Sequence, residues 1–227
     1  ILFPIVQGNF FEDLRQQSAE FVTSQNMPGI AIGGLSVGET AEEFNHFLNH
    51  TVQYLPEDKP KYVMGIGTPE YILDAVQAGI DMFDCVLPTR NARNGSYFTR
   101  KGMLSIKQER WTHDFGPLDP ECNCKVCRTY SRSYLRHLFK EQEILSSILA
   151  SYHNLYFLNE MLKEIRVAID EAMKCKKTGE SKNIVFGLTG TGYFDLFAYE
   201  RFRKGEMTDY IPTDEELQAS FAKLPKV

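Results

Sequence analysis

Residues 62–87 read YVMGIGTPEYILDAVQAGIDMFDCVL, and they contain one complete strand–helix–strand pattern. YVMGIG is an apolar run that ends in glycines, and MFDCVL is a second apolar run. Between them, TPEYILDAVQAG has helical spacing, with a Thr-Pro start, Thr68 as expected N-cap, and a glycine stop. Strands that alternate with helices at this spacing indicate parallel βαβ units, so we expect an α/β protein.

The same alternation extends toward the N-terminus. Residues 1–8 and 30–38 are expected strands, and residues 11–26 and 40–55 are expected helices. In the first helix the apolar spacing places on one side Phe11, Leu14, Phe21 and Val22. The second helix begins with Thr40 followed by Glu43, which resembles a capping box. Four strands and three helices do not close an eight-stranded barrel, so half of a barrel and a small open sheet both remain open.

The pattern changes after residue 95. SYFTRKGMLSIKQ, residues 96–108, alternates like a β-hairpin with Lys101-Gly102 at the turn. Residues 130–174 have the pattern of two long helices, and the composition shifts again after residue 181. We therefore divide the chain into a βα part at 1–95, a hairpin and helical part at 96–177, and an atypical tail at 178–227.

Composition places the chain among globular proteins. It has 227 residues, of which 43% are hydrophobic, and no apolar run approaches the roughly 18 residues that a membrane span needs. No signal peptide pattern is present, and the first residue, Ile1, lies inside an apolar pattern, so we expect a fragment. The crowding of three of the five cysteines suits a metal site in the reducing cytoplasm.

Charge is unevenly distributed along the chain. The net charge is −5, but residues 1–87 hold 12 acidic and 3 basic side chains, which gives −9. Residues 88–140 hold 4 acidic and 11 basic side chains, which gives +7. One basic segment in an acidic chain is either a solvated surface or an electrostatic footprint for phosphates.

The strongest motif is ECNCKVC at residues 121–127. Cys122, Cys124 and Cys127 form C-x-C-x2-C, and His153 follows 26 residues after the last cysteine. Three thiolates and an imidazole make a closed, tetrahedral zinc site of the structural type, with Zn2+ as the expected ion. His113 and His137 are alternatives for the fourth ligand.

Asp84 lies at the end of an expected strand, where ligand groups collect in parallel α/β folds. Such an acid can act as a nucleophile or general base, whereas the alternative is a helix cap or a salt bridge with Arg90 or Arg93. The neighbouring Cys85 should point to the other side of the strand as a small buried hydrophobe. The two arginines stand in an expected loop and match phosphate geometry. Glycines end the other strands, where they either admit a ligand or form tight turns.

Several separate stretches of the chain resemble tRNA-guanine transglycosylases. These are GIDMFDCVLPTRNARNG at 79–95, GPLDPECNCKVC with YSRSYL at 116–135, and IAIGGLSVGE at 30–39. The resemblance runs from about Ile5 to Met173. It implies a (β/α)8 TIM-type barrel with an inserted zinc-binding subdomain. It also implies exchange of guanine at the tRNA wobble position for a 7-deazaguanine, in queuosine biosynthesis.

The resemblance also implies roles for individual residues. Asp84 matches the nucleophile that attacks the ribose C1′ and leaves a covalent tRNA–enzyme intermediate. The substrate-binding positions are Gln7 and Gly34 for the base, Leu35, Ser36 and Glu39 around the peptide that reads the 7-substituent, and Met64 packing on the base. The positions that match contacts to the anticodon loop are Arg90, Arg93 and Asn94. The positions that match the zinc ligands are Cys122, Cys124, Cys127 and His153.

Val37 bears on the choice of base. The bacterial type of the family has a bulky residue where the queuine-using type has glycine. A valine would crowd the cyclopentenediol of queuine, so the resemblance favours 7-aminomethyl-7-deazaguanine (preQ1).

Two departures from the family are visible. The N-terminal half, which supplies a second catalytic aspartate and a stacking aromatic, is absent, so the chain alone is expected to be inactive. Residues 181–227 instead weakly resemble the C-terminus of PLP-dependent, tryptophan-synthase-β-like enzymes, with Gly190 and Gly192 in a possible cofactor-side loop, although no PLP binding is expected. The alternative function is that of a non-catalytic, zinc-containing tRNA-binding subunit or an inactive fragment of such an enzyme.

Members of the family commonly dimerise around the zinc region, so the resemblance also implies a homodimer.

Overall fold

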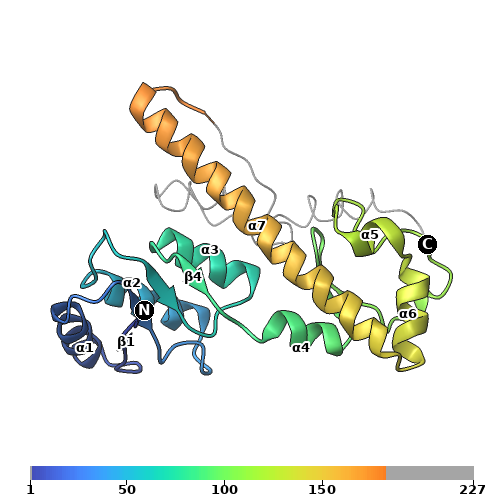
Figure 1. The fold of residues 1–227 in the computed structure, drawn as a ribbon, viewed down its shortest axis with the longest axis horizontal. Coiled ribbons are helices and arrows are strands. Elements are labelled where there is room, and N and C mark those ends of the chain that lie inside the picture. The colour runs from blue at the N-terminus through green and yellow to red at the C-terminus, as the bar shows by residue number, and fades with distance from the viewer. Residues whose placement is uncertain (1, 183–227) are drawn as a thin grey trace, which may run out of the picture. The chain divides into compact units, whose positions relative to one another are not determined.

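The computed structural model describes residues 2–182, and its first part is a parallel α/β layer (Figure 1). Four strands pair in the order β1-β2-β3-β4, and each adjacent pair is parallel. The strands are β1 (Ile5–Val6), β2 (Ile30–Ile32), β3 (Lys61–Val63) and β4 (Met82–Phe83). The helices between them are α1 (Glu12–Ser24), α2 (Ala41–Val52) and α3 (Pro69–Gln77). The expected βαβ alternation is confirmed, and the described sheet is open.

Local sequence explains where two of these helices begin. At α2 the capping box is confirmed: the Thr40 hydroxyl accepts from the Glu43 N–H at 3.2 Å, and the Glu43 carboxylate accepts from the Thr40 N–H at 2.9 Å. At α3 the first helical residue is Pro69, whose fixed φ suits a helix start. Thr68 is the N-cap residue by position, but its side chain makes no capping hydrogen bond.

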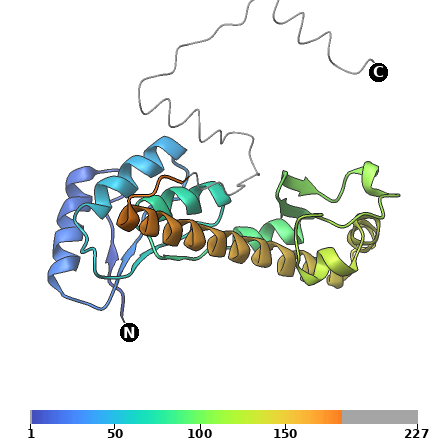
Figure 2. The same cartoon turned by 90° about the horizontal axis from the view of Figure 1, so that it is seen from above.

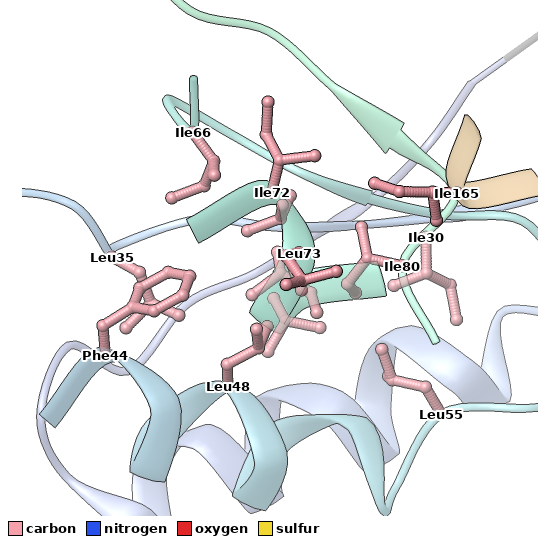
Figure 3. Close-up of a cluster of buried hydrophobic side chains, with 14 of the residues drawn as sticks. Ile30, Leu35, Phe44, Leu48, Leu55, Ile66, Ile72, Leu73, Ile80 and Ile165 are labelled. Atoms are coloured by element: carbon pink, nitrogen blue, oxygen red, sulfur yellow. The ribbon is translucent and has the colours of Figure 1, made fainter. Parts of the chain in front are cut away.

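The core of the α/β layer lies between the sheet and its helices (Figure 3). Ile30 and Ile32 of β2 are buried against Phe44 and Leu48 of α2. The Phe44 ring also stacks on Tyr71 of α3, with 4.6 Å between ring centroids. This packing fixes both helices against the sheet and therefore fixes the loops that leave the carboxyl ends of its strands.

The first helix buries a different face from the one its apolar spacing indicated. Its buried residues are Arg15, Ala19 and Val22. By contrast, the structure leaves largely exposed Phe11, Leu14 and Phe21. Of the four residues that the spacing placed together, Val22 alone is buried, because the sheet meets the helix along its small and polar positions.

The fourth strand is shorter than MFDCVL suggested. Strand β4 ends at Phe83, and Met82 is 47% exposed, so the expected buried strand is an exposed edge in the described chain. A helix, α4 (Leu87–Arg93), follows at once. The arginines expected in a loop therefore stand on a helix, which the Pro88 position at its start favours.

The second part begins with an antiparallel hairpin of β5 (Ser96–Thr99) and β6 (Gly102–Ser105). Its turn residues are Arg100 and Lys101, because Gly102 already pairs with Thr99. The expected Lys101-Gly102 turn is thus wrong by one residue. A short 3-10 helix (Glu109–Trp111) and three α-helices follow, namely α5 (Lys125–Thr129), α6 (Arg132–Lys140) and α7 (Ile144–Thr178).

Helix α7 packs on both parts of the described chain (Figure 2). Ala150, near its start, belongs to a core cluster with Tyr97 and Leu135. Further along, Met161 and Ile165 belong to the core of the α/β layer. One continuous helix therefore holds the hairpin and cysteine region against the strands. Within residues 2–182, no helix is long and apolar enough to cross a membrane. The tail expectations, including Gly190 and Gly192, lie outside the described residues.

Candidate functional site

At the carboxyl ends of the four strands, the loop of each strand approaches the loop of the next strand in the sheet. A Cβ atom added at either glycine of Gly33–Gly34 would lie 2.8 or 3.0 Å from the Gln7 amide, so β1 and β2 meet there. Ser36 and Gly65 approach next, with 4.0 Å from the Ser36 Cβ to a Cβ built at Gly65. The Gly65 N–H then donates to Asp84 Oδ1 at 3.1 Å. One continuous edge thus carries residues from all four strand ends.

Asp84 is held by β3 rather than by the arginines. Its Oδ1 accepts from the Tyr62 hydroxyl at 2.5 Å and from Gly65 N–H, while its Oδ2 has no hydrogen-bond partner in the described chain. The bond to the Asp84 carboxylate raises the pKa of Tyr62 to about 12. Among residues 2–182, no ion pair joins Asp84 to Arg90 or Arg93, so the salt-bridge alternative is wrong.

Cys85 packs on the neighbouring loop. A Cβ at Gly67 would lie 2.2 Å from the Cys85 Cβ, so only glycine fits opposite this cysteine. The Cys85 Sγ lies 3.5 Å from the Gly65 carbonyl oxygen and 3.4 Å from the Leu87 nitrogen. Cys85 is half-buried rather than fully buried. Its thiol packs against the loop after β3, whose Gly65 N–H donates to Asp84.

The loop after β2 is held from one side by Glu39. Its carboxylate accepts from three successive backbone N–H groups, those of Ser36, Val37 at 2.8 Å and Gly38 at 3.1 Å. Ser36 adopts a left-handed φ of 60°, which an ordinary residue keeps only when its surroundings hold it. Glu39 supplies that hold, as a carboxylate on consecutive N–H dipoles.

Arg15 holds the same loop from the other side. Its side chain is fully buried. Its Nη2 donates to the carbonyls of Gly33 and Gly34, each at 3.1 Å, and its Nε donates to the Asn9 carbonyl at 2.5 Å. Its Nη1 lies 3.4 Å from the Thr51 hydroxyl. Burial lowers the pKa of Arg15, and the negative charge of Glu39 raises it.

The other expected base contacts differ in exposure. Leu35 is buried in the core, and Met64 is half-buried directly after β3, where its N–H donates to the Ile32 carbonyl at 3.1 Å. Val37 is 68% exposed at the tip of the loop. The structure therefore leaves the Val37 side chain available to a ligand and uses the Leu35 side chain as an anchor.

The expected RNA contacts lie on and after α4. Arg90 and Arg93 are exposed, and Asn94 is the C-cap residue, with its amide donating to the Arg90 carbonyl at 3.0 Å. Because the helix is fixed at its start by a buried Pro88, the two arginines, three residues apart, project from one surface.

The cysteine motif and one histidine form a compact cluster. The ligand atoms of Cys122, Cys124, Cys127 and His153 all lie within 4.8 Å of one another. His153 Nδ1 is 3.9, 3.4 and 3.4 Å from the three sulfurs in turn. A tetrahedral zinc with ordinary bond lengths would place sulfur and nitrogen about 3.6 Å apart, so these residues fit the ion. The neighbouring Cys122 and Cys127 thiols lower the pKa of Cys124.

The structure thereby confirms that His153 is the histidine that joins the three cysteines. The alternatives, His113 and His137, are exposed and lie outside the cluster. His153 Nε2 lies 2.7 Å from the Phe98 carbonyl, which orients the ring and directs Nδ1 to the sulfurs. Four protein ligands leave no open position, so the site is structural.

Asn154 connects this cluster to α4. It is fully buried, its amide donates to the carbonyls of Pro88 at 2.9 Å and Ser96 at 3.1 Å, and its oxygen accepts from Phe98 N–H at 3.0 Å. Since Asn154 follows His153 directly on α7, the metal cluster and the arginine helix share one anchor.

Three residues of the site were not found from sequence: Arg15, Tyr62 and Asn154. A single arginine on an amphipathic helix and a tyrosine in a strand carry no pattern that separates them from ordinary positions. The adjacent His153 and Asn154 on an otherwise apolar helical face were a usable signal, because buried polar groups need partners.

Comparison with known proteins gives one consistent family. A family model described as queuine tRNA-ribosyltransferase matches residues 1–175. The queuine tRNA-ribosyltransferase of Treponema denticola is 59% identical over 168 residues, which cover 74% of this chain and 44% of that protein. Those of Streptococcus pneumoniae strain Hungary19A-6 and Caldanaerobacter subterraneus are 56% and 54% identical over the same length, covering 44% and 45% of those proteins. The chain thus spans less than half the length of these relatives.

Proposed function

Because the chain belongs to the queuine tRNA-ribosyltransferase family, we propose that it supplies the nucleophile, part of the base pocket and the zinc-bearing RNA module of a tRNA-guanine transglycosylase. The reaction exchanges guanine at the anticodon wobble position for a 7-deazaguanine, in queuosine biosynthesis. The observation that carries the proposal is Asp84, whose Oδ1 is fixed at the edge where four strand ends meet.

The chemistry follows from that carboxylate. Oδ1 is occupied by Tyr62 and Gly65, so Oδ2 is the oxygen that attacks the ribose C1′. The bond from C1′ to guanine breaks, the base leaves with a proton from a general acid, and an ester joins Asp84 to the tRNA. The incoming base then gives up a proton, attacks C1′ and releases the carboxylate. The second acid is assigned to the part of the relatives that this chain does not match.

The loop after β2 suits an aminomethyl base. Ser36 N–H donates to Glu39, and in a trans peptide the carbonyl before it points the opposite way. The Leu35 carbonyl therefore points away from Glu39 and is an acceptor for the ammonium group of preQ1. Exposed Val37 beside it would crowd a larger cyclopentenediol, so preQ1 rather than queuine is the proposed base. Gln7, Gly34 and Met64 complete this half of the pocket.

We place the tRNA anticodon loop on the surface of α4. Arg90 and Arg93 are exposed there beside Asn94, within a segment of net charge +7 from residue 88 to 140. Such arginines neutralise backbone phosphates, and the target base must leave its stack to reach Asp84. The zinc cluster stiffens this module through Asn154, which ties α7 to the start of α4.

The exposed apolar face near β1 fits the proposal of an incomplete barrel. The side chains that are exposed there are Leu2, Ile5, Phe11, Leu14 and Phe21. In a complete (β/α)8 barrel a further βα unit covers each such edge. We therefore assign residues 1–95 to part of a barrel, residues 96–177 to the zinc-bearing module and residues 178–227 to an appended tail.

A homodimer around the zinc module is part of the proposal. Tyr130 and Tyr134 stack at 5.4 Å between ring centroids, and Phe115 beside them is 79% exposed. Aromatic side chains of this kind are enriched in protein interfaces. The thiolate cluster suits a reducing compartment, so the cytoplasm is the proposed location.

The proposal is tested in an exchange chimera. In it, the matched 168-residue segment of the T. denticola relative is replaced by the corresponding segment of this chain. Incorporation of radiolabelled guanine into tRNA is expected with the chimera and is expected to disappear with Asp84→Ala. The exposed Asp58→Ala is the matched control and should retain activity. A chimera that folds and binds tRNA without exchange would favour the alternative, a non-catalytic tRNA-binding subunit.

A further inference from the structure

Arg15 is a buried cation whose partners are all backbone carbonyls and one hydroxyl. Within residues 2–182 no carboxylate forms an ion pair with it. Burying an arginine without an acid is costly unless its donors are used. Here they are used on the two glycines that follow β2 and on Asn9 after β1. The hydrogen bonds of Arg15 therefore hold the loops that follow β1 and β2.

The direction of the two glycine carbonyls fixes the direction of two N–H groups. In a trans peptide the C=O and the following N–H point in opposite directions. Because the Gly33 and Gly34 carbonyls both turn toward Arg15, the N–H groups of Gly34 and Leu35 point away from it. Arg15 lies on the buried side, so these N–H groups face the side on which Gly34 is partly exposed.

The remaining N–H groups of the loop are already occupied. Those of Ser36, Val37 and Gly38 all donate to Glu39. In the described chain, the N–H groups of Gly34 and Leu35 have no hydrogen-bond partner. Two adjacent, unused backbone donors, fixed between Arg15 and Glu39, suit an acceptor oxygen such as the carbonyl of a purine-like base.

We propose that Arg15 is a positioning residue for base recognition: it turns the Gly33 and Gly34 carbonyls inward so that the Gly34 and Leu35 N–H groups are presented to the base carbonyl. Arg15 does not touch the base. The inference rests on the proposed function, because that function places the base at this loop. It extends that function by assigning a role to a residue of α1.

Kinetics on the exchange chimera test the role. Arg15→Ala is expected to raise KM for guanine about 5- to 10-fold, as for loss of one or two weakened hydrogen bonds, with KM for tRNA unchanged. Added ethylguanidinium should lower KM for guanine again in Arg15→Ala but not in wild type. Gln17→Ala, at an exposed position of the same helix, is the control and should leave both KM values unchanged. A variant with normal KM for guanine, or one in which both KM values rise together without rescue, overturns the proposal.

A second measurement does not need activity. In the full 227-residue chain labelled with 15N-glycine, Arg15→Ala should shift the Gly34 amide resonance and speed its hydrogen exchange, while Gly179, the C-cap residue of α7, stays unchanged. If Arg15→Ala does not fold, Arg15→Lys gives the same readout, since the single nitrogen of lysine cannot bind the Asn9 carbonyl and both glycine carbonyls as Nε and Nη2 of Arg15 do. An unmoved Gly34 resonance would refute the positioning role. An inactive wild-type chimera with a shifted Gly34 resonance would instead count against the proposed function alone.

Discussion

The hydroxyl of Tyr62 donates a 2.5 Å hydrogen bond to Oδ1 of Asp84, and so joins the middle of β3 to the residue after β4. This contact orients the carboxylate and leaves Oδ2 without a hydrogen-bond partner in the described chain. It also has a measurable consequence for the ionisation of the phenol.

Tyr62 should titrate well above an ordinary tyrosine. Its pKa is raised from 10.0 to about 12, because the bond to Asp84 favours the neutral phenol. The stability from this bond is complete below pH 10 and is lost as the pH rises toward 12. Ultraviolet difference titration of wild type against Tyr62→Phe should show one phenol ionising near 12. In Asp84→Ala that phenol should ionise closer to 10; an unchanged value would show that the contact is absent.

Asn154 should be among the costliest polar residues to replace. Asn154→Leu leaves the Pro88 and Ser96 carbonyls and the Phe98 N–H without their partner. The expected loss in free energy of unfolding is about 3 kcal/mol, since each buried unsatisfied group costs about 1–3 kcal/mol and some are resolvated. Urea denaturation measures it. The control is Asn159→Leu, on the exposed side of α7, which should change stability by about 0.5 kcal/mol or less.

The metal cluster should hold one zinc ion per chain. Cys127→Ser and His153→Ala each remove a ligand, and both should lose the ion on dialysis against a mild chelator. His113→Ala and His137→Ala should retain it, since both histidines lie outside the cluster. Metal content measured by atomic emission separates the two pairs. Retention of zinc in His153→Ala would assign the fourth ligand elsewhere.

Glu39 should affect the aminomethyl base more than guanine. Glu39→Gln replaces one carboxylate oxygen by a donor, which cannot accept from the Ser36, Val37 and Gly38 N–H groups together. The Leu35 carbonyl is then no longer fixed, so KM for preQ1 in the exchange chimera should rise about 10-fold, and KM for guanine less. Glu57→Gln, an exposed acid in the turn before β3, is the control. An equal rise in KM for preQ1 and for guanine would show that Glu39 has no role in recognising the 7-substituent.

The alternation of strands and helices could be predicted because it depends on local spacing and capping. Thr40 with Glu43 shows this, since both partners lie within four residues. The face of α1 could not be predicted, because Phe11 and Phe21 look like core residues while the helix instead buries Arg15. What decides that choice is a set of carbonyls after β2, which no local pattern in α1 reveals.

The candidate site shows the same division. The cysteines were predictable because ligand spacing is a local pattern, and His153 because few histidines lie on the following helices. Tyr62 acts through a contact to a residue 22 positions away, and Asn154 acts through three contacts to residues at least 56 positions away, so their roles appear only in three dimensions. The spacing of Asp84 with Arg90 favoured a salt bridge, which the start of α4 at Leu87 prevents by directing the arginines along a helix.

The most direct test of the central claim is trapping of the covalent intermediate. The exchange chimera is incubated with tRNA in the presence of a base analogue that cannot complete the second displacement, and is then run on a denaturing gel. With wild-type Asp84 we expect a protein band shifted by the mass of tRNA. With Asp84→Ala we expect no shifted band, and with Asp58→Ala we expect the same shifted band as in wild type. A shifted band that persists in Asp84→Ala would contradict the assignment of Asp84 as the nucleophile.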